Sequence, residues 1–204
     1  MDFNLSVYLS GLTVAIGLIV AIGPQNAYLL KQGIARAHVA SVVMVCVLSD
    51  IALISLGVAG LGKFIAQSPM LIQVATWGGA GFLLLYGLRA FYAALHPSAL
   101  ETSGSIQTQW RGAVLTGLAF TFLNPYVYLD TVVLMGSVSG QFATARFSFW
   151  LGCITASSAW FVMLGVFASQ LAPLFAKPSS WRVLDCIVGV IMCATAWHLV
   201  SQFG

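Results

Sequence analysis

The stretch AIGPQNAYLLKQG, residues 21–33, places a proline, a glutamine and an asparagine side by side at the end of a long apolar run. Proline removes one backbone donor and clashes with the carbonyl four residues earlier, so a helix kinks or breaks there. The freed carbonyl belongs to Val20, and in lipid it must find a partner within the protein. Gln25 and Asn26 carry amides that can donate to it. The stretch therefore predicts a broken helix inside a membrane.

The composition supports a membrane setting. The chain has 204 residues, of which 60% are hydrophobic and 6% charged, and its mean hydropathy is +0.97. Soluble domains carry about 25% charged residues, so this chain is expected to be an integral membrane protein. Its net charge of +3 is too small and too scattered to indicate nucleic-acid binding.

The chain shows no pattern typical of an enzyme. Its four cysteines lie in apolar runs, form no C-x-x-C pair and have no metal-ligating neighbours in the sequence. They are therefore interpreted as small buried hydrophobic residues, and neither a metal nor a cofactor is expected. Motifs of intramembrane proteases, such as H-E-x-x-H and G-x-S-x-G, do not occur.

Six stretches are apolar and long enough to cross a bilayer, which takes about 20 residues. They cover residues 5–30, 39–61, 71–93, 112–138, 147–171 and 183–203. The gaps are short except for a Ser/Thr/Gln-rich connector at 94–111. We therefore predict an all-α membrane protein with one transporter domain, 1–204, divided into halves at about 1–93 and 112–204.

Each half opens with a proline break. The fourth stretch contains LNPYVYLD, in which Asn124 precedes Pro125. The freed carbonyl is that of Thr121, and the Asn124 amide is a suitable donor to it. Three crossings per half give the halves opposite orientations, as in the inverted repeats of many secondary transporters, where broken helices hold the substrate near the midplane. An ordinary kink whose amides join neighbouring helices is the alternative.

Basic residues predict the orientation, because they concentrate in cytoplasmic loops. Six lie in or beside the odd-numbered connections and two in the even-numbered ones: Lys31, Arg36, Arg89, Arg111, Lys177 and Arg182 against Lys63 and Arg146. This bias predicts that the odd-numbered loops are cytoplasmic and that both termini face outward. A first stretch that enters and returns would leave five crossings.

Two carboxylates lie within predicted spans, Asp50 in the second and Asp130 five residues after Pro125. An acid at the centre of a membrane helix costs about 2.5–3.5 kcal/mol, and by default it indicates a functional site. Pairing with Lys31 or Arg89 is the structural alternative, although both bases are expected near span ends, where their long side chains can reach the headgroups. The two acids are predicted to receive a substrate cation, a proton, or each in turn.

Other polar and aromatic residues have weaker interpretations. Three tyrosines near the breaks could stack on a guanidinium or ammonium group or simply pack: Tyr28, Tyr126 and Tyr128. Asp185 is expected to form an interfacial pair with Arg182. His198 could relay protons, but a lone histidine there is more often a hydrogen-bonded packing residue. The glycines after Trp77, and the G-x-x-x-G formed by Gly136 and Gly140, are predicted to permit close helix packing.

Four motifs in order resemble the LysE/ArgO family of bacterial basic amino acid exporters: GPQNAYLLKQGI, LSD in the second span, TWGGAGFLLLYG and LNPYVYLDT. The match runs from Gly11 to about Val200. The related homoserine/threonine branch has a P-G-P-N-like first motif, so G-P-Q-N indicates the lysine/arginine branch. Matched to the family motifs are Gly23, Pro24, Gln25, Asn26, Asp50, Asn124, Pro125 and Asp130; Tyr128 joins them as a predicted substrate-binding residue.

The resemblance implies export of L-arginine, with L-lysine as a second candidate, across the bacterial cytoplasmic membrane. An exported cation moves against a negative-inside potential, which opposes it by about 2.3 kcal/mol per 100 mV. Exchange with protons is therefore expected, with Asp50 and Asp130 each holding either the substrate cation or a proton. Export of neutral amino acids and a passive cation-selective channel are the alternatives. The lipid bilayer is expected to surround the protein, and whether the protein forms a homodimer is left open.

Overall fold

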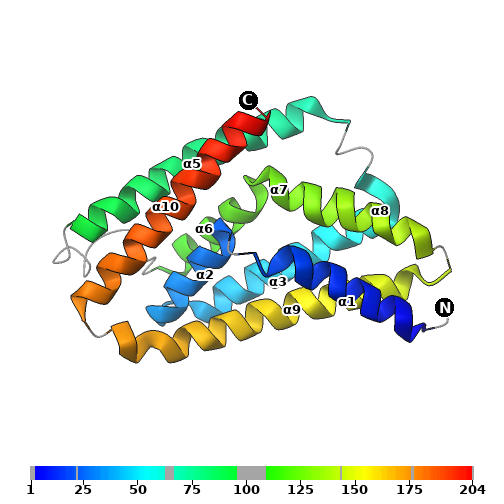
Figure 1. The fold of residues 1–204 in the computed structure, drawn as a ribbon, viewed down its shortest axis with the longest axis horizontal. Coiled ribbons are helices and arrows are strands. Elements are labelled where there is room, and N and C mark those ends of the chain that lie inside the picture. Colours follow the sequence, from blue (N-terminus) through cyan, green and yellow to red (C-terminus); the bar gives the residue numbers. More distant parts are fainter. Residues whose placement is uncertain are drawn as a thin grey trace.

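The computed structural model describes residues 3–21, 23–62, 67–95, 109–142, 144–175 and 177–203. Within these ranges every regular element is a helix (Figure 1). In chain order they are α1 (Leu5–Ile19), α2 (Pro24–Ile34), α3 (Val39–Leu56), η1 (Gly57–Leu61), α5 (Pro69–Leu95), α6 (Trp110–Phe122), α7 (Pro125–Tyr128), η3 (Leu129–Leu134), α8 (Met135–Ser139), η4 (Gly140–Phe142), α9 (Arg146–Leu171), η5 (Ala172–Phe175) and α10 (Pro178–Phe203).

The helices agree with the predicted spans. Four are long and apolar enough to cross a membrane: Val39–Leu61, Ile72–Leu95, Arg146–Phe175 and Ser179–Gln202. The other two candidates are bent pairs, with 80° between α1 and α2 and 65° between α6 and the segment Pro125–Phe142. The predicted breaks in the first and fourth helices are confirmed. The described chain has four to six spans, depending on whether each bent pair crosses as one.

Large apolar side chains cover the outside of the bundle. Trp197 is 77% exposed, Met70 76% and Leu115 65%, and many other leucines, valines and phenylalanines also point outward. A soluble protein rarely exposes apolar patches larger than a few hundred Å². Hydrocarbon is the solvent that suits such a surface.

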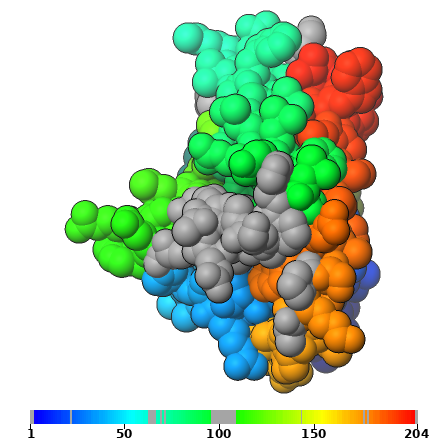
Figure 2. Space-filling view, turned by 90° about the vertical axis from the view of Figure 1, so that its left-hand side faces the viewer, coloured from blue at the N-terminus to red at the C-terminus, as the bar shows by residue number. Residues whose placement is uncertain are grey.

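Long helix pairs form the frame of the molecule. In Figure 1, α5 and α10 lie side by side and antiparallel, and α1 packs along α9. Figure 2 shows the junction of α2 and α3 (light blue) beside the end of α9 and the start of α10 (orange), while the end of α10 (red) lies at the opposite end of the molecule. Beyond the first break, α2 packs against α9 and α10, and α6 of the second bent pair packs against α3.

Two predicted glycine motifs are used inside the chain. A Cβ at Gly79 would overlap the carbonyl oxygen of Leu123, so this glycine lets α5 approach the end of α6 at the second break. A Cβ at Gly136 would lie 2.5 Å from the carbonyl oxygen of Gly57. Gly136 therefore packs against its own chain and offers no surface to a second copy. Homodimerisation stays a prediction.

The division into two halves also stays a prediction. The connector expected at 94–111 lies outside the described residues, except for its ends in α5 and at the start of α6. Each half contributes one bent pair followed by two long helices.

Candidate functional site

The first break lies between Ile19, the last residue of α1, and Pro24, the first residue of α2. Proline suits this first helical position, where its missing N–H would have no helical partner. The Asn26 side-chain amide donates to the carbonyls of Ile19 and Ala21, both at 2.9 Å. Sequence reasoning predicted a bond to Val20, and the amide binds the carbonyls on either side of it.

The second break separates Phe122, at the end of α6, from Pro125, at the start of α7. Asn124 was expected to donate to a freed carbonyl, and this was wrong. Its Oδ1 accepts the backbone N–H of Tyr126 at 3.1 Å, because an asparagine preceding a helix is a favoured N-cap. The Tyr128 hydroxyl donates instead to the Phe122 carbonyl at 2.8 Å.

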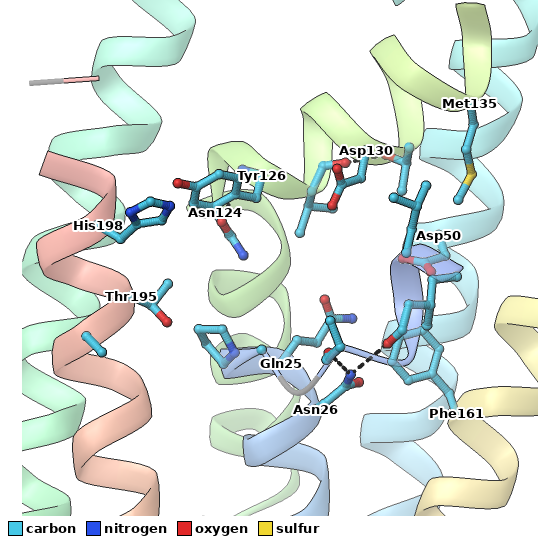
Figure 3. Close-up of a pocket in the computed structure, with 18 residues that line it drawn as sticks. Gln25, Asn26, Asp50, Asn124, Tyr126, Asp130, Met135, Phe161, Thr195 and His198 are labelled. Carbon is cyan, nitrogen blue, oxygen red and sulfur yellow. Dashed lines mark hydrogen bonds between the residues drawn. The ribbon is translucent and has the colours of Figure 1, made fainter. Parts of the chain in front are cut away.

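A cavity of about 520 Å³ lies between the two breaks (Figure 3). Most of the predicted site residues line it: Gly23, Pro24, Gln25, Asn26, Asp50, Asn124 and Asp130. Pro125 and Tyr128 are not among its lining residues. Pro125 is buried where α7 begins, and the Tyr128 hydroxyl binds the carbonyl of Phe122 at the end of α6. Small-molecule sites commonly measure about 300–1,000 Å³, so an amino acid fits this cavity.

The two predicted acids face this same cavity. Asp130 lies in the π-helical segment η3, is half-buried and points into the cavity (Figure 3). In the described part of the chain its carboxylate has no hydrogen bond or ion pair. Asp50 is 4% exposed and accepts a hydrogen bond from the Ser157 hydroxyl at 2.6 Å. Neither acid pairs with a basic side chain among the described residues, so the structural alternative for them is wrong.

The Gln25 amide points toward the acids from the opposite wall of the cavity (Figure 3). Its buried Nε2 approaches the weakly accepting Cys46 thiol and has no oxygen acceptor within the described ranges. A buried polar group without a partner is costly. A polar ligand in the cavity would supply the missing acceptor.

His198 is a cavity residue that sequence reasoning missed. It is exposed to the cavity rather than packed, and its ring stacks on Tyr126 with 5.6 Å between centroids and 10° between planes. Thr195, one turn earlier in α10, also lines the cavity. A histidine in a membrane span was a visible signal, but only the fold brings α10 against the second break.

The three tyrosines therefore differ in position. Tyr126 lines the cavity, whereas Tyr28 is 0% exposed and packs against Tyr86 and Phe120, at 6.0 and 5.1 Å between centroids. Cation stacking on Tyr28 was a wrong interpretation, because no ligand in the cavity can reach its ring.

Two further predictions are corrected by one contact. Lys31 was expected to reach headgroups and Asp185 to pair with Arg182, but Lys31 pairs with Asp185 and both residues are 0% exposed. Arg182 donates instead to the Ala94 carbonyl at 3.0 Å. Nearly all of α2 is buried among the other helices, so Lys31 lies inside the bundle. Without Lys31 the loop bias is still five basic residues against two.

Asn26→Ala is expected to destabilise the protein by about 1–3 kcal/mol, because it leaves the partly buried carbonyls of Ile19 and Ala21 without their donor. The measurement is thermal unfolding of the purified protein in detergent. Gln170→Ala, which removes an exposed amide at the end of α9, is the matched control and should change little. Equal melting temperatures for the two variants would contradict the bridging role of Asn26.

Comparison with known proteins now adds the family. The model of the LysE type translocators matches residues 16–202. The chain belongs to the LysE family. This LysE-family chain is a multi-pass membrane protein of a bacterial transporter family and not an enzyme, and the family resemblance drawn from four motifs is confirmed.

Curated relatives of this LysE-family chain are of two kinds. It is 46% identical to a putative amino-acid transporter of Mycobacterium tuberculosis over 177 residues, 87% of this chain and 88% of the relative. It is 42% and 41% identical to arginine exporter proteins ArgO of Serratia proteamaculans and Yersinia enterocolitica, over 201 residues, 97% of this chain and 98% of each relative. No solved structure matches the chain.

Proposed function

We propose that this protein exports L-arginine, with L-lysine as a second candidate substrate, across the bacterial cytoplasmic membrane in exchange for protons. One observation carries the proposal: Asp50 and Asp130 face one cavity, and no lysine or arginine of the described chain lines it. A cavity whose described lining has two carboxylates and neither lysine nor arginine favours a cation. The Serratia and Yersinia relatives, named as arginine exporters, support the same substrate.

The cavity offers a partner for each part of the substrate. A guanidinium or ammonium group would bind Asp130, whose oxygens are open to the cavity, and a guanidinium can donate two parallel hydrogen bonds to one carboxylate. The substrate carboxylate would lie near the N-terminus of α2, where backbone N–H groups favour an anion. Gln25 Nε2 lies buried at that end and would donate to it.

Proton exchange follows from the charges. Export of one cation alone is opposed by about 2.3 kcal/mol for each 100 mV of negative-inside potential. One inward proton cancels this charge, and two would also draw on the potential. A carboxylate that holds a proton attracts a cation far less, so competition at Asp50 and Asp130 enforces exchange.

Alternating access would come from rocking of the two halves about the shared cavity. Residues at each proline break line the cavity: Gly23–Asn26 in the first half, and Asn124, Tyr126, Val127 and Asp130 in the second. Inverted three-helix halves, with both termini facing outward, would make two such arrangements nearly equivalent in energy.

Counterflow of labelled arginine in proteoliposomes tests the function. Vesicles loaded with unlabelled arginine are expected to accumulate labelled arginine transiently above its equilibrium level and to respond to an imposed pH gradient. Lysine in excess should compete, and threonine should not. Competition by threonine and not by lysine would favour a neutral amino acid exporter. The name of the M. tuberculosis relative, a putative amino-acid transporter, is also consistent with that function. Downhill equilibration without accumulation would indicate a channel.

A further inference from the structure

The buried pair of Lys31 and Asp185 joins α2 to α10 in the interior of the bundle. Both residues are 0% exposed. One carboxylate oxygen, Asp185 Oδ2, is buried and has no hydrogen-bond partner among the described residues. Apolar side chains of similar volume usually stabilise a protein as well as a buried ion pair does or better. Stability alone is therefore a poor reason for this pair.

The pair lies away from the cavity along both helices. Lys31 follows Pro24, at the cavity, by seven residues, about 10 Å of helix, and Asp185 precedes Thr195 by ten, about 15 Å. It is therefore near the end where α2 finishes and α10 begins. That end carries the basic residues Arg36, Lys177 and Arg182, which predict the cytoplasmic side.

Packed aromatic rings separate the pair from the cavity. Tyr28 lies one turn nearer the cavity than Lys31 and contacts Tyr86 and Phe120, while Phe120 contacts Phe82 at 4.8 Å. The Tyr28 hydroxyl donates to the Ala113 carbonyl at 3.1 Å and accepts from Gln32 Nε2 at 3.0 Å. A substrate that entered from that end would have to pass these rings and the ion pair before it reached the cavity.

The chemistry of the pair matches that of the proposed cargo. The Lys31 ammonium is the group that a lysine substrate carries, and the buried Oδ2 of Asp185, which has no donor among the described residues, could accept the second bond of a guanidinium. A zwitterionic amino acid that enters between the two residues can give its cation to Asp185 and its carboxylate to Lys31. Both buried charges keep a partner throughout this exchange.

The geometry points to Asp185 as a second cation-binding station, beyond the central cavity, which Lys31 occupies while the path on that side is closed. This inference rests on the proposed function, since it needs a cationic amino acid as cargo. Lys31 acts as a tethered stand-in for the substrate, and the substrate displaces it on entry.

The first test replaces both charges, with Lys31→Met and Asp185→Leu in one protein. This variant is expected to fold at least as well as the wild type, because no charge is left buried alone. Arginine counterflow is expected to fall about tenfold or more, since the station is lost. Ser148→Ala, which removes a buried hydroxyl bound to the Asn4 backbone N–H far from the pair, is the matched control. Counterflow in the double variant equal to that of this control would overturn the proposal.

The second test keeps the ion pair and measures whether a water-soluble reagent can reach its surroundings. Val188 is 1% exposed and lies one turn beyond Asp185 in α10. In a background with the four native cysteines changed to serine, Val188→Cys is expected to react with a charged, water-soluble thiol reagent, and arginine should slow the reaction. Ser148→Cys is the control and should stay unlabelled. Equal protection of both cysteines from the reagent would show that no aqueous path reaches the pair, which refutes the station.

The two tests separate this inference from the function on which it rests. A wild type without arginine counterflow refutes the proposed function. A wild type that exchanges arginine, alongside an equally active double variant, refutes the station alone.

Discussion

Asp130→Asn is expected to abolish arginine counterflow while the protein still inserts into the membrane at its normal level. Asp130 presents its carboxylate to the cavity without an internal partner in the described chain, so its negative charge is free for a ligand. Removing one partner of a buried ion pair costs about 3–5 kcal/mol, and tenfold corresponds to about 1.4 kcal/mol. A fall of about 100-fold or more is therefore expected in counterflow.

The local structure around Asp130 explains why its replacement by asparagine should leave the fold intact. The side chain makes no hydrogen bond within the described residues, so asparagine of the same shape breaks no internal contact. Asp130→Glu is the matched control: it keeps the charge, moves it by one methylene and should retain partial activity. Normal arginine exchange by Asp130→Asn at equal protein level would remove Asp130 from the mechanism.

Asp50→Asn is expected to uncouple exchange from protons. Asp50 is 4% exposed at the cavity wall and is held by the Ser157 hydroxyl. Because Asp50 is so little exposed, a proton can reach it more easily than a bulky substrate can. Without it, arginine counterflow should continue at a reduced rate, while an imposed pH gradient should no longer change the direction or the rate of net flux.

Flux is measured in proteoliposomes with the pH difference varied at a fixed membrane potential. Ser157→Ala is the control, because it removes the hydrogen bond and keeps the carboxylate. It should shift the pH dependence without abolishing it. Net flux in Asp50→Asn that still follows the pH gradient as in the wild type would assign proton coupling to another group.

His198, a residue of α10, is stacked on Tyr126 at the second break and also lines the cavity. Two carboxylates and one imidazole therefore contribute to the cavity wall. In the described chain the lining has no lysine or arginine, so the cavity keeps its preference for cations whether His198 is neutral or charged.

The sequence by itself determined the features that follow from local chemistry. An apolar run of about 20 residues must become a helix in lipid, because its backbone has no other hydrogen-bond partners there. A proline within the run must interrupt that helix, so both breaks were predictable at Pro24 and Pro125. Asp50 and Asp130 were predictable as functional candidates because an acid in hydrocarbon is costly.

Only the tertiary structure decided which polar groups meet. Lys31 pairs with Asp185 across 154 positions of sequence, and His198 joins Tyr126 because α10 packs beside the second break. The sequence favoured Asn124 as a donor to a freed carbonyl, whereas the fold places its Oδ1 where it accepts the Tyr126 N–H at the start of α7. Contacts between distant helices depend on how their surfaces pack, and the local structural preferences of each segment do not determine that packing.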